Sequence, residues 1–261
     1  MSALLDMGRA GRRLDGVDIV DMHGHLGPYA YGQPQATAAA LIADMDRVGV
    51  AAIACSHMQC LGDDMARGND EILAAMQAWP GRILGYACAW PSDRDSVRRE
   101  IELRLGQGFT GIKIHRTPGF SYLDPSYEPA FALAHEQRRP VLLHTWAEDR
   151  DFSELRELAG RYPEAPILMA HSGVHSEGRH IELARQCPNI YLDTAMSRMP
   201  RGAMERLVAG AGAERVLWGS DALFLSLTYE VGRALGARLP DDVKRQIMGG
   251  NARRILGSIR S

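Results

Sequence analysis

Short apolar runs alternate with longer amphipathic stretches along the chain. Eight runs rich in valine, isoleucine and leucine are predicted as strands, at 17–23, 50–55, 83–89, 111–115, 141–144, 167–171, 190–193 and 216–219. The stretches between them carry apolar residues near helical spacing, for example at 37–48, 92–105, 128–138 and 177–186. This alternation is typical of parallel strands that are joined by crossover helices.

The number of repeated units favours a closed barrel. Eight strand–helix units without a linker predict one α/β domain over 1–261, folded as a single (β/α)8 TIM barrel. An open doubly wound sheet usually has fewer strands and a phosphate-binding glycine loop. The nearest match to such a loop, at Gly210 and Gly212, lacks the third glycine. Gly49, Gly106 and Pro140 directly follow helical runs, where they are expected to end the helices.

Composition and charge exclude several classes of partner. Of the 261 residues, 46% are hydrophobic and 24% are charged, which is ordinary for a protein with a large core. The formal net charge is −2 and no basic stripe occurs, so nucleic acid is not an expected partner. No apolar segment is long enough to span a membrane, and the N-terminus lacks the pattern of a signal peptide. We therefore expect a cytoplasmic protein with four reduced cysteines, at Cys55, Cys60, Cys88 and Cys187.

Polar residues close five of the eight predicted strands. In the first strand, Asp21, His23 and His25 share a parity and are predicted to point to one side of the sheet. Later strands end at Lys113, His115, His144, His171 and Asp221. In a TIM barrel the carboxyl ends of the strands form one rim, which carries the chemistry. Imidazoles and a carboxylate that converge there predict a divalent-ion site.

The ordered motifs DMHGH, LLHT, MAHSG and GSD, followed by GGNARRIL, carry a family resemblance. Together they resemble the amidohydrolase superfamily, in particular its amidohydrolase 2 branch. The segment YLDPSYEPAFALAHEQRRPVLLHT is also similar to the stretch before the strand-five histidine of that branch, and the resemblance extends over 18–256. It implies a (β/α)8 fold and a zinc or similar ion that activates water or a substrate oxygen.

The resemblance also implies roles for individual residues. His23, His25, His144 and Asp221 match the metal ligands, and His171 matches a polarising or proton-transfer group. We expect one ion per chain, Zn²⁺ or another divalent ion such as Mn²⁺. Lys113 stands where two-metal members have a bridging residue. We expect a plain lysine that faces substrate, and the alternative is a carboxylated lysine with a second ion.

Further polar and aromatic residues near the rim are candidates for substrate binding. Arg116 follows the fourth strand, where its guanidinium is either an anchor for a substrate carboxylate or a solvated loop side chain. His57, His115 and Trp146 also follow strands and are expected to line the pocket. Asp193 closes the seventh strand but receives no role, because the resemblance offers no matching position.

These expectations combine into a predicted reaction on a small-molecule substrate, with assembly into a homo-oligomer left open. The main hypothesis is ion-dependent hydrolysis of an amide, lactone or ester of a small carboxylated substrate. Asp221 would accept the proton of the attacking water, and His171 would stabilise the oxyanion. The alternative is a metal-dependent decarboxylase of an aromatic or unsaturated acid. A non-catalytic ligand-binding barrel is disfavoured, because all the histidines and the aspartate of the pattern are present.

Overall fold

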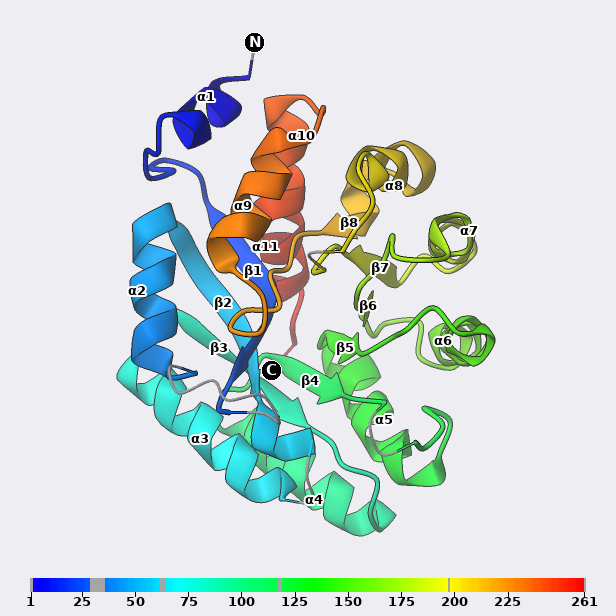
Figure 1. The fold of residues 1–261 in the computed structure, drawn as a ribbon. Coiled ribbons are helices and arrows are strands. Elements are labelled where there is room, and N and C mark those ends of the chain that lie inside the picture. Colours follow the sequence, from blue (N-terminus) through cyan, green and yellow to red (C-terminus); the bar gives the residue numbers. More distant parts are fainter. Residues whose placement is uncertain (1, 29–35, 62–63, 117–118, 197, 261) are drawn as a thin grey trace.

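The computed structural model describes residues 2–28, 36–61, 64–116, 119–196 and 198–260. Within these ranges, parallel strands form one eight-stranded sheet in sequential order (Figure 1). They are β1 (Ile19–Leu26), β2 (Val50–His57), β3 (Ile83–Cys88), β4 (Gly111–Ile114), β5 (Val141–Leu143), β6 (Ile167–Met169), β7 (Ile190–Asp193) and β8 (Val216–Leu217). The predicted (β/α)8 barrel is confirmed.

Backbone contacts between the first and last strands close the barrel. The Met22 amide donates to the Trp218 carbonyl over 3.3 Å, and the Asp221 amide donates to the His23 carbonyl over 2.7 Å. Gly24 and Ala222 form a further parallel bridge. These bonds bring the carboxyl ends of β1 and β8 together, so that polar residues on the two strands meet.

Helices surround the barrel and cover the outer face of its strands (Figure 1). Their bounds in the described ranges are α1 (Ala3–Arg9), α2 (Ala38–Val48), α3 (Met65–Ala78), α4 (Arg94–Gly106), α5 (Glu128–Gln137), α6 (Asp149–Arg161), α7 (Glu177–Gln186), α8 (Ala203–Ala211), α9 (Leu227–Gly236), α10 (Asp241–Arg245) and α11 (Asn251–Leu256). Short helical turns lie at η1 (Met58–Leu61), η2 (Pro125–Tyr127), η3 (Ala213–Arg215) and the π-helical η4 (Gln246–Gly250).

The helix boundaries follow local sequence signals. The Thr37 hydroxyl accepts a hydrogen bond from the Ala40 amide and caps the start of α2. Gly49 follows α2 with a φ of 94°, a left-handed conformation that glycine adopts without a steric penalty. Gly106 was expected to follow the helix, but it is the last residue of α4, so the helix ends one residue later than predicted. Arg138, rather than Pro140, ends α5, with a φ of 54°.

Two apolar clusters surround the strands. The larger packs between the strands and the outer helices, and the smaller fills the barrel with side chains that include Val20, Met22, Tyr86, Leu142 and Leu168. Ala252 and Ile255 of α11 join the inner cluster. Since α11 also contacts β1 and β8, the last helix packs against the inner cluster and contributes to the barrel core.

A β-bulge in β1 interrupts the side-chain alternation that the sequence predicted, so the prediction of one face for Asp21, His23 and His25 is wrong. The pairing of β1 with β2 shifts register between Asp21 and Gly24. Met22 therefore lies in the inner cluster, whereas Asp21 pairs in register with Ile53 of the outer cluster. His25 pairs with Ser56, and its Nδ1 lies 2.9 Å from the Ser56 hydroxyl. The extra residue breaks the simple period of two, so Asp21 does not share a face with His23 and His25.

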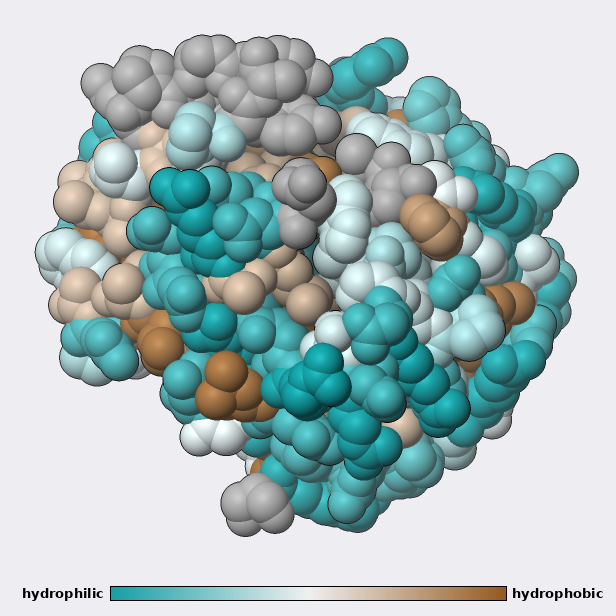
Figure 2. All heavy atoms as spheres, turned by 90° about the horizontal axis from the view of Figure 1, so that it is seen from below, coloured by the Kyte–Doolittle hydropathy of each residue, from teal (hydrophilic) through white to brown (hydrophobic). Residues whose placement is uncertain are grey.

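The outer surface carries scattered apolar side chains. On the face seen in Figure 2, hydrophobic residues are dispersed among hydrophilic ones. In the part of the chain that the structure describes, no helix has the length and apolar character that crossing a membrane requires.

Candidate metal centre

Two imidazoles and one carboxylate converge where β1 and β8 meet. His23 Nε2 lies 3.2 Å from His25 Nε2, and on β1 His23 lies within the bulge and His25 beyond it. Asp221 follows β8, and its Oδ1 lies 3.2 Å from His25 Nε2 and 3.5 Å from His23 Nε2. Atoms that bind one ion at about 2.1 Å are separated by about 3.0–3.5 Å. The three atoms therefore have the spacing of ligands to a single divalent ion.

A second pair of imidazoles lies at the ends of β5 and β6. His144 follows β5 and His171 follows β6, and His144 Nδ1 lies 3.3 Å from His171 Nε2. The His115 ring packs against the His144 ring at 3.9 Å between centroids. His144 Nε2 is buried and has no hydrogen-bond partner within the described residues. An unpartnered buried nitrogen at this rim is what a further metal-binding position requires.

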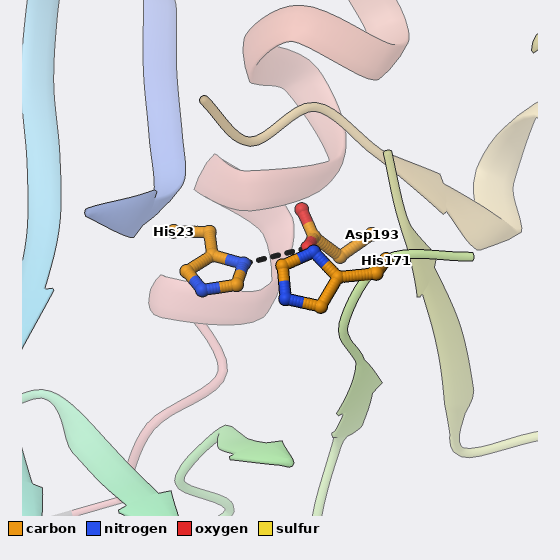
Figure 3. Close-up of side chains that lie close together, drawn as sticks. All are labelled: His23, His171 and Asp193. Carbon is orange, nitrogen blue, oxygen red and sulfur yellow. Dashed lines mark hydrogen bonds and ion pairs between the residues drawn. The ribbon is translucent and has the colours of Figure 1, made fainter. Parts of the chain in front are cut away.

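Asp193, which received no role from the sequence, lies beside His23. Its Oδ2 is 2.8 Å from His23 Nδ1, and His23, His171 and Asp193 form a second compact group (Figure 3). Tyr191 of the same strand belongs to the inner cluster, and Asp193 shares its parity. The signal in the sequence was this parity, together with the position of Asp193 at a strand end.

Lys113 of β4 reaches into the same group of side chains. Its Nζ lies 3.4 Å from His23 Nε2, and the side chain is almost fully buried. Burial lowers the pKa of Lys113 to about 8, although the nearby Asp221 and Asp193 oppose this shift. The ammonium form is the main one at neutral pH, so Lys113 adds positive charge to the site.

Burial and neighbouring charge shift the ionisation of the other groups. Burial and the charge of Lys113 lower the pKa of His23 well below its usual value. Burial alone would raise the pKa of Asp221, but its hydrogen bond to His25 and its proximity to His25, His171 and Lys113 hold it below the usual value. Neutral imidazoles and an ionised carboxylate are the protonation states in which these residues bind metal.

Several residues at the rim adopt left-handed backbone conformations. His171 has a φ of 60° and Asp221 a φ of 57°, and Ala147 and His175 have similar values. Such angles are uncommon for residues other than glycine and cost about 1–2 kcal/mol each. Strained backbone of this kind concentrates at functional sites, where the surrounding structure imposes it.

Aromatic rings flank the imidazoles. Trp146 is half exposed, and its ring lies 4.4 Å from the His144 ring and 5.9 Å from the His171 ring between centroids. Phe224, which the sequence analysis did not select, lies 5.5 Å from the His25 ring. The site therefore offers apolar ring surfaces beside its polar groups.

In the structure Arg116 pairs with carboxylates of the chain itself, which argues against the expectation that it binds a substrate carboxylate. The Arg116 side chain is buried, and its guanidinium pairs with Asp151 and, over 2.8 Å, with Glu154 of α6. It also stacks over the Tyr122 ring at 4.0 Å. Both terminal nitrogens donate to carboxylates of the chain itself, so Arg116 ties the end of β4 to α6. A local pattern around Arg116 does not reveal acidic partners that lie 35 and 38 residues away.

His57 also lies apart from the converging imidazoles. It ends β2 and lines a cavity of about 650 Å³ together with Gly27, Arg67 and Glu71. Its Nδ1 accepts a hydrogen bond from the Gln59 amide. A contact between His57 and substrate therefore stays a prediction.

Comparison with solved structures supports the fold. An uncharacterised TIM-barrel protein from Bordetella bronchiseptica is 18% identical, with a TM-score of 0.75 over 93% of this chain and 99% of the other. The 2,6-dihydroxybenzoate decarboxylase from Rhizobium is 15% identical, with a TM-score of 0.75 over 92% and 99%. The 5-carboxyvanillate decarboxylase from Novosphingobium aromaticivorans, complexed with manganese and a nitrobenzoic acid, is 15% identical, with a TM-score of 0.75 over 93% and 96%.

Comparison of sequences identifies the family. No functionally characterised protein in the curated set matches the chain by sequence. A family model described as Amidohydrolase, however, matches residues 20–258. This match spans every strand from β1 to β8 except the first residue of β1, and it includes every residue of the candidate centre. The chain belongs to the amidohydrolase family.

Proposed function

We propose that the chain is a metal-dependent decarboxylase of a small aromatic carboxylic acid. The half-exposed Trp146 beside an imidazole-rich centre that contains Lys113 carries this proposal. A flat aromatic ring can stack on exposed indole, and a carboxylate is attracted by Lys113. Two of the structurally similar proteins named above are decarboxylases of aromatic acids, which supports this alternative over the hydrolase that the sequence favoured.

The residues that would hold the ion are His23, His25 and Asp221, with His144 as a fourth ligand. The fit rests on the spacing of the first three ligand atoms, at 3.2–3.5 Å, and on the unpartnered Nε2 of His144. Imidazole and carboxylate ligands suit Mn²⁺ as well as Zn²⁺. We favour Mn²⁺ over the zinc expected from the sequence, because a similar decarboxylase contains manganese. When bound, such an ion polarises the oxygen atoms of a carboxylic substrate.

The chain's own groups would orient the acid and move one proton. Decarboxylation breaks the bond between the ring carbon and the carboxylate, carbon dioxide leaves, and the electron pair that stays on carbon takes up a proton. Asp221 and His171 stand at the rim, where His171 is buried and Asp221 is partly buried. We assign the transfer of this proton to Asp221, whose ionised carboxylate would first take a proton from the solvent and then pass it to the ring carbon. We assign the positioning of the carboxylate to Lys113. Partial burial of the site strengthens these electrostatic contacts relative to bulk water.

Hydrolysis is the second candidate, and the match to the amidohydrolase model favours it. In that reaction Asp221 would take a proton from water, and His171 would donate a hydrogen bond to the developing oxyanion once its Nε2 is also protonated. The same side chains therefore serve both reactions, and the substrate distinguishes them.

A paired activity screen tests the proposal. Protein loaded with Mn²⁺ is given a panel of hydroxylated benzoic acids, and carbon dioxide release is measured. A parallel panel contains esters, lactones and amides of similar size. We expect carbon dioxide from at least one acid. Hydrolysis without any decarboxylation would contradict the proposal and establish the second candidate.

The tryptophan gives a more specific prediction. Replacement of Trp146 by alanine removes the half-exposed ring but leaves the three converging ligand atoms in place. We expect the KM for the best acid to rise about 10-fold, since the loss of one ring contact costs about 0.5–1.5 kcal/mol and the loss of buried area adds to it. Replacement of the equally exposed Tyr229 on α9 is the matched control. An unchanged KM in Trp146→Ala would remove the ring from the substrate site.

A further inference from the structure

The segment 193–195 at the end of β7 holds two imidazoles from other strands. Asp193 Oδ2 lies 2.8 Å from His23 Nδ1, and the Ala195 carbonyl oxygen lies 2.5 Å from His171 Nδ1 (Figure 3 shows both rings beside Asp193). His23 comes from β1, whereas His171 follows β6. One short segment therefore contacts the Nδ1 atoms of both rings.

The chemistry of the Ala195 contact fixes one tautomer. A backbone carbonyl can only accept a hydrogen bond, so His171 must carry its hydrogen on Nδ1. Neutral His171 then has its lone pair on Nε2, which lies 3.3 Å from His144 Nδ1. His144 Nδ1 must therefore donate, and the lone pair of neutral His144 is left on its buried, unpartnered Nε2.

The Asp193 contact has the same effect on His23. Asp193 Oδ1 accepts from the Ala195 amide over 3.3 Å, which leaves Oδ2 as an acceptor for a hydrogen on His23 Nδ1. The lone pair of His23 is then on Nε2, the atom that lies 3.2 Å from His25 Nε2.

The surroundings hold this segment in place. The Thr194 amide donates to the Leu217 carbonyl over 3.0 Å, and Arg233 of α9 donates to the Thr194 carbonyl. Gly219 provides the room for Asp193, because a Cβ at that position would lie 2.2 Å from Asp193 Oδ1 and 2.8 Å from His23 Cβ. The close approach of Asp193 to His23 therefore depends on the glycine that follows β8 as well as on the end of β7.

We propose that Asp193 is a positioning residue, which together with the Ala195 carbonyl sets the tautomers of His23, His171 and His144 so that each presents the lone pair of Nε2. This inference rests on the proposed metal centre for its purpose, but the tautomers themselves exist without metal. A carboxylate that accepts from the remote nitrogen of a ligating histidine typically contributes 10–100-fold to metal affinity.

The experiment is a long-range ¹H–¹⁵N correlation spectrum of metal-free protein with ¹⁵N-labelled histidine. In the wild type we expect the ring hydrogen of neutral His23, His171 and His144 on Nδ1. A wild-type spectrum with the hydrogen of His23 on Nε2, as a protonated Asp193 that donates to Nδ1 would produce, overturns the proposal. This measurement uses the wild-type protein alone, so a folding defect in a variant cannot affect it.

Asp193→Asn sharpens the test. The asparagine oxygen can still accept the hydrogen bond from the Ala195 amide, so the side-chain NH₂ faces His23 Nδ1. This NH₂ donates to Nδ1 and should move the hydrogen of His23 to Nε2. His171 should keep its tautomer, and Mn²⁺ affinity should fall about 10–100-fold. The matched control is Asp21→Asn, which alters another fully buried aspartate that bonds the His23 and Ser220 amides and no imidazole.

The Asp193→Asn variant and the wild type together separate the inference from the proposed function. An Asp193→Asn protein whose His23 tautomer is unchanged contradicts the positioning role. If instead the tautomers follow the expectation but the wild type binds no Mn²⁺, the positioning role stands and the proposed metal-dependent function fails.

Discussion

Asp221 connects ion binding with proton transfer at the level of a single residue. Its carboxylate lies within 3.5 Å of both β1 imidazoles, on a strained backbone that a catalytic role would explain. We expect Asp221→Asn to retain part of the bound metal, because an amide oxygen still coordinates weakly. Turnover should fall about 10²-fold or more, the usual effect of a lost proton-transfer group. Metal content and kcat are measured on the same sample, and near-normal turnover would move the proton transfer to His171.

Arg116 illustrates a structural rather than a functional charge. Its partners Asp151 and Glu154 are buried, and Arg116→Met leaves two carboxylates without their cation. We expect the free energy of unfolding to fall by about 3–5 kcal/mol, as measured by urea denaturation. Arg206→Met is the control, because the pair of Arg206 with Glu177 lies at the surface and should contribute about 1 kcal/mol or less. An Arg116→Met protein with unchanged stability and a raised KM would restore the carboxylate-anchor hypothesis.

Single residues were predictable from the sequence where their position along a strand was enough. His23, His25, His144, His171 and Asp221 all close apolar runs, and the structure brings their side chains to one rim. Asp193 closes a run in the same way, but its importance lies in the contact with His23, 170 residues away. Partners so distant in sequence are fixed only by the closed barrel.

At the level of elements, the final helical segment is held against β1 by a glycine. A Cβ on Gly249 would lie 1.8 Å from the Asp18 carbonyl oxygen, a backbone atom that cannot move without shifting β1. We expect Gly249→Ala to destabilise the fold by several kcal/mol, at or above the usual cost of about 1–3 kcal/mol for overpacking.

The neighbouring glycine is the matched control. Gly250 belongs to the same π-helical turn, and a Cβ there would meet its nearest neighbour at 3.8 Å. Gly250→Ala should leave stability unchanged or raise it by about 0.5–1 kcal/mol, because alanine favours helical backbone. Thermal unfolding of both variants gives the comparison, and equal stabilities would contradict the packing argument.

Elements were predicted well where the signal was periodic and local. The helix 37–48 agrees with α2 because Thr37 and Gly49 supply its caps. The bulge in β1 could not be predicted from alternation, which assumes a regular strand. The later strands are shorter than predicted, since β6 ends at Met169 and β8 at Leu217. His171 and Asp221 instead lie beyond the strands in left-handed conformations.

At the scale of the whole molecule, His180 links stability to pH. It is fully buried in α7, its Nδ1 lies 2.9 Å from the Ser176 carbonyl, and burial lowers its pKa to about 4. Between pH 6.5 and about 4 the unfolded chain binds a proton that the folded protein does not, so stability falls as the pH falls through this window. The contribution between pH 7 and pH 5 is about 2 kcal/mol.

The variant His180→Asn isolates this contribution. Asparagine can still donate to the Ser176 carbonyl but does not titrate, so the loss of stability from pH 7 to pH 5 should shrink by about 2 kcal/mol relative to the wild type. Urea denaturation at the two pH values measures the difference. Identical pH dependence in the two proteins would mean that His180 binds protons equally in the folded and unfolded states, so that burial does not lower its pKa.

Metal binding should also stabilise the whole barrel, because the proposed ligands come from the first strand and from the segment that follows the last strand. An ion that binds only the folded state adds about 2.7 kcal/mol when its free concentration is 100 times its Kd. Thermal unfolding with Mn²⁺ and with a chelator gives this shift. The absence of any shift in the wild type would argue against a site that joins β1 to β8.

Titration of metal-free protein with Mn²⁺ shows whether His23, His25 and Asp221 hold one divalent ion. We predict saturable binding of close to one ion per chain. Binding should be lost in His25→Ala, which removes one of the three converging ligand atoms, and retained in His180→Asn, which alters a histidine in an outer helix. Saturable binding that is equal in wild type and His25→Ala, or no binding at all, would contradict this assignment of the metal ligands.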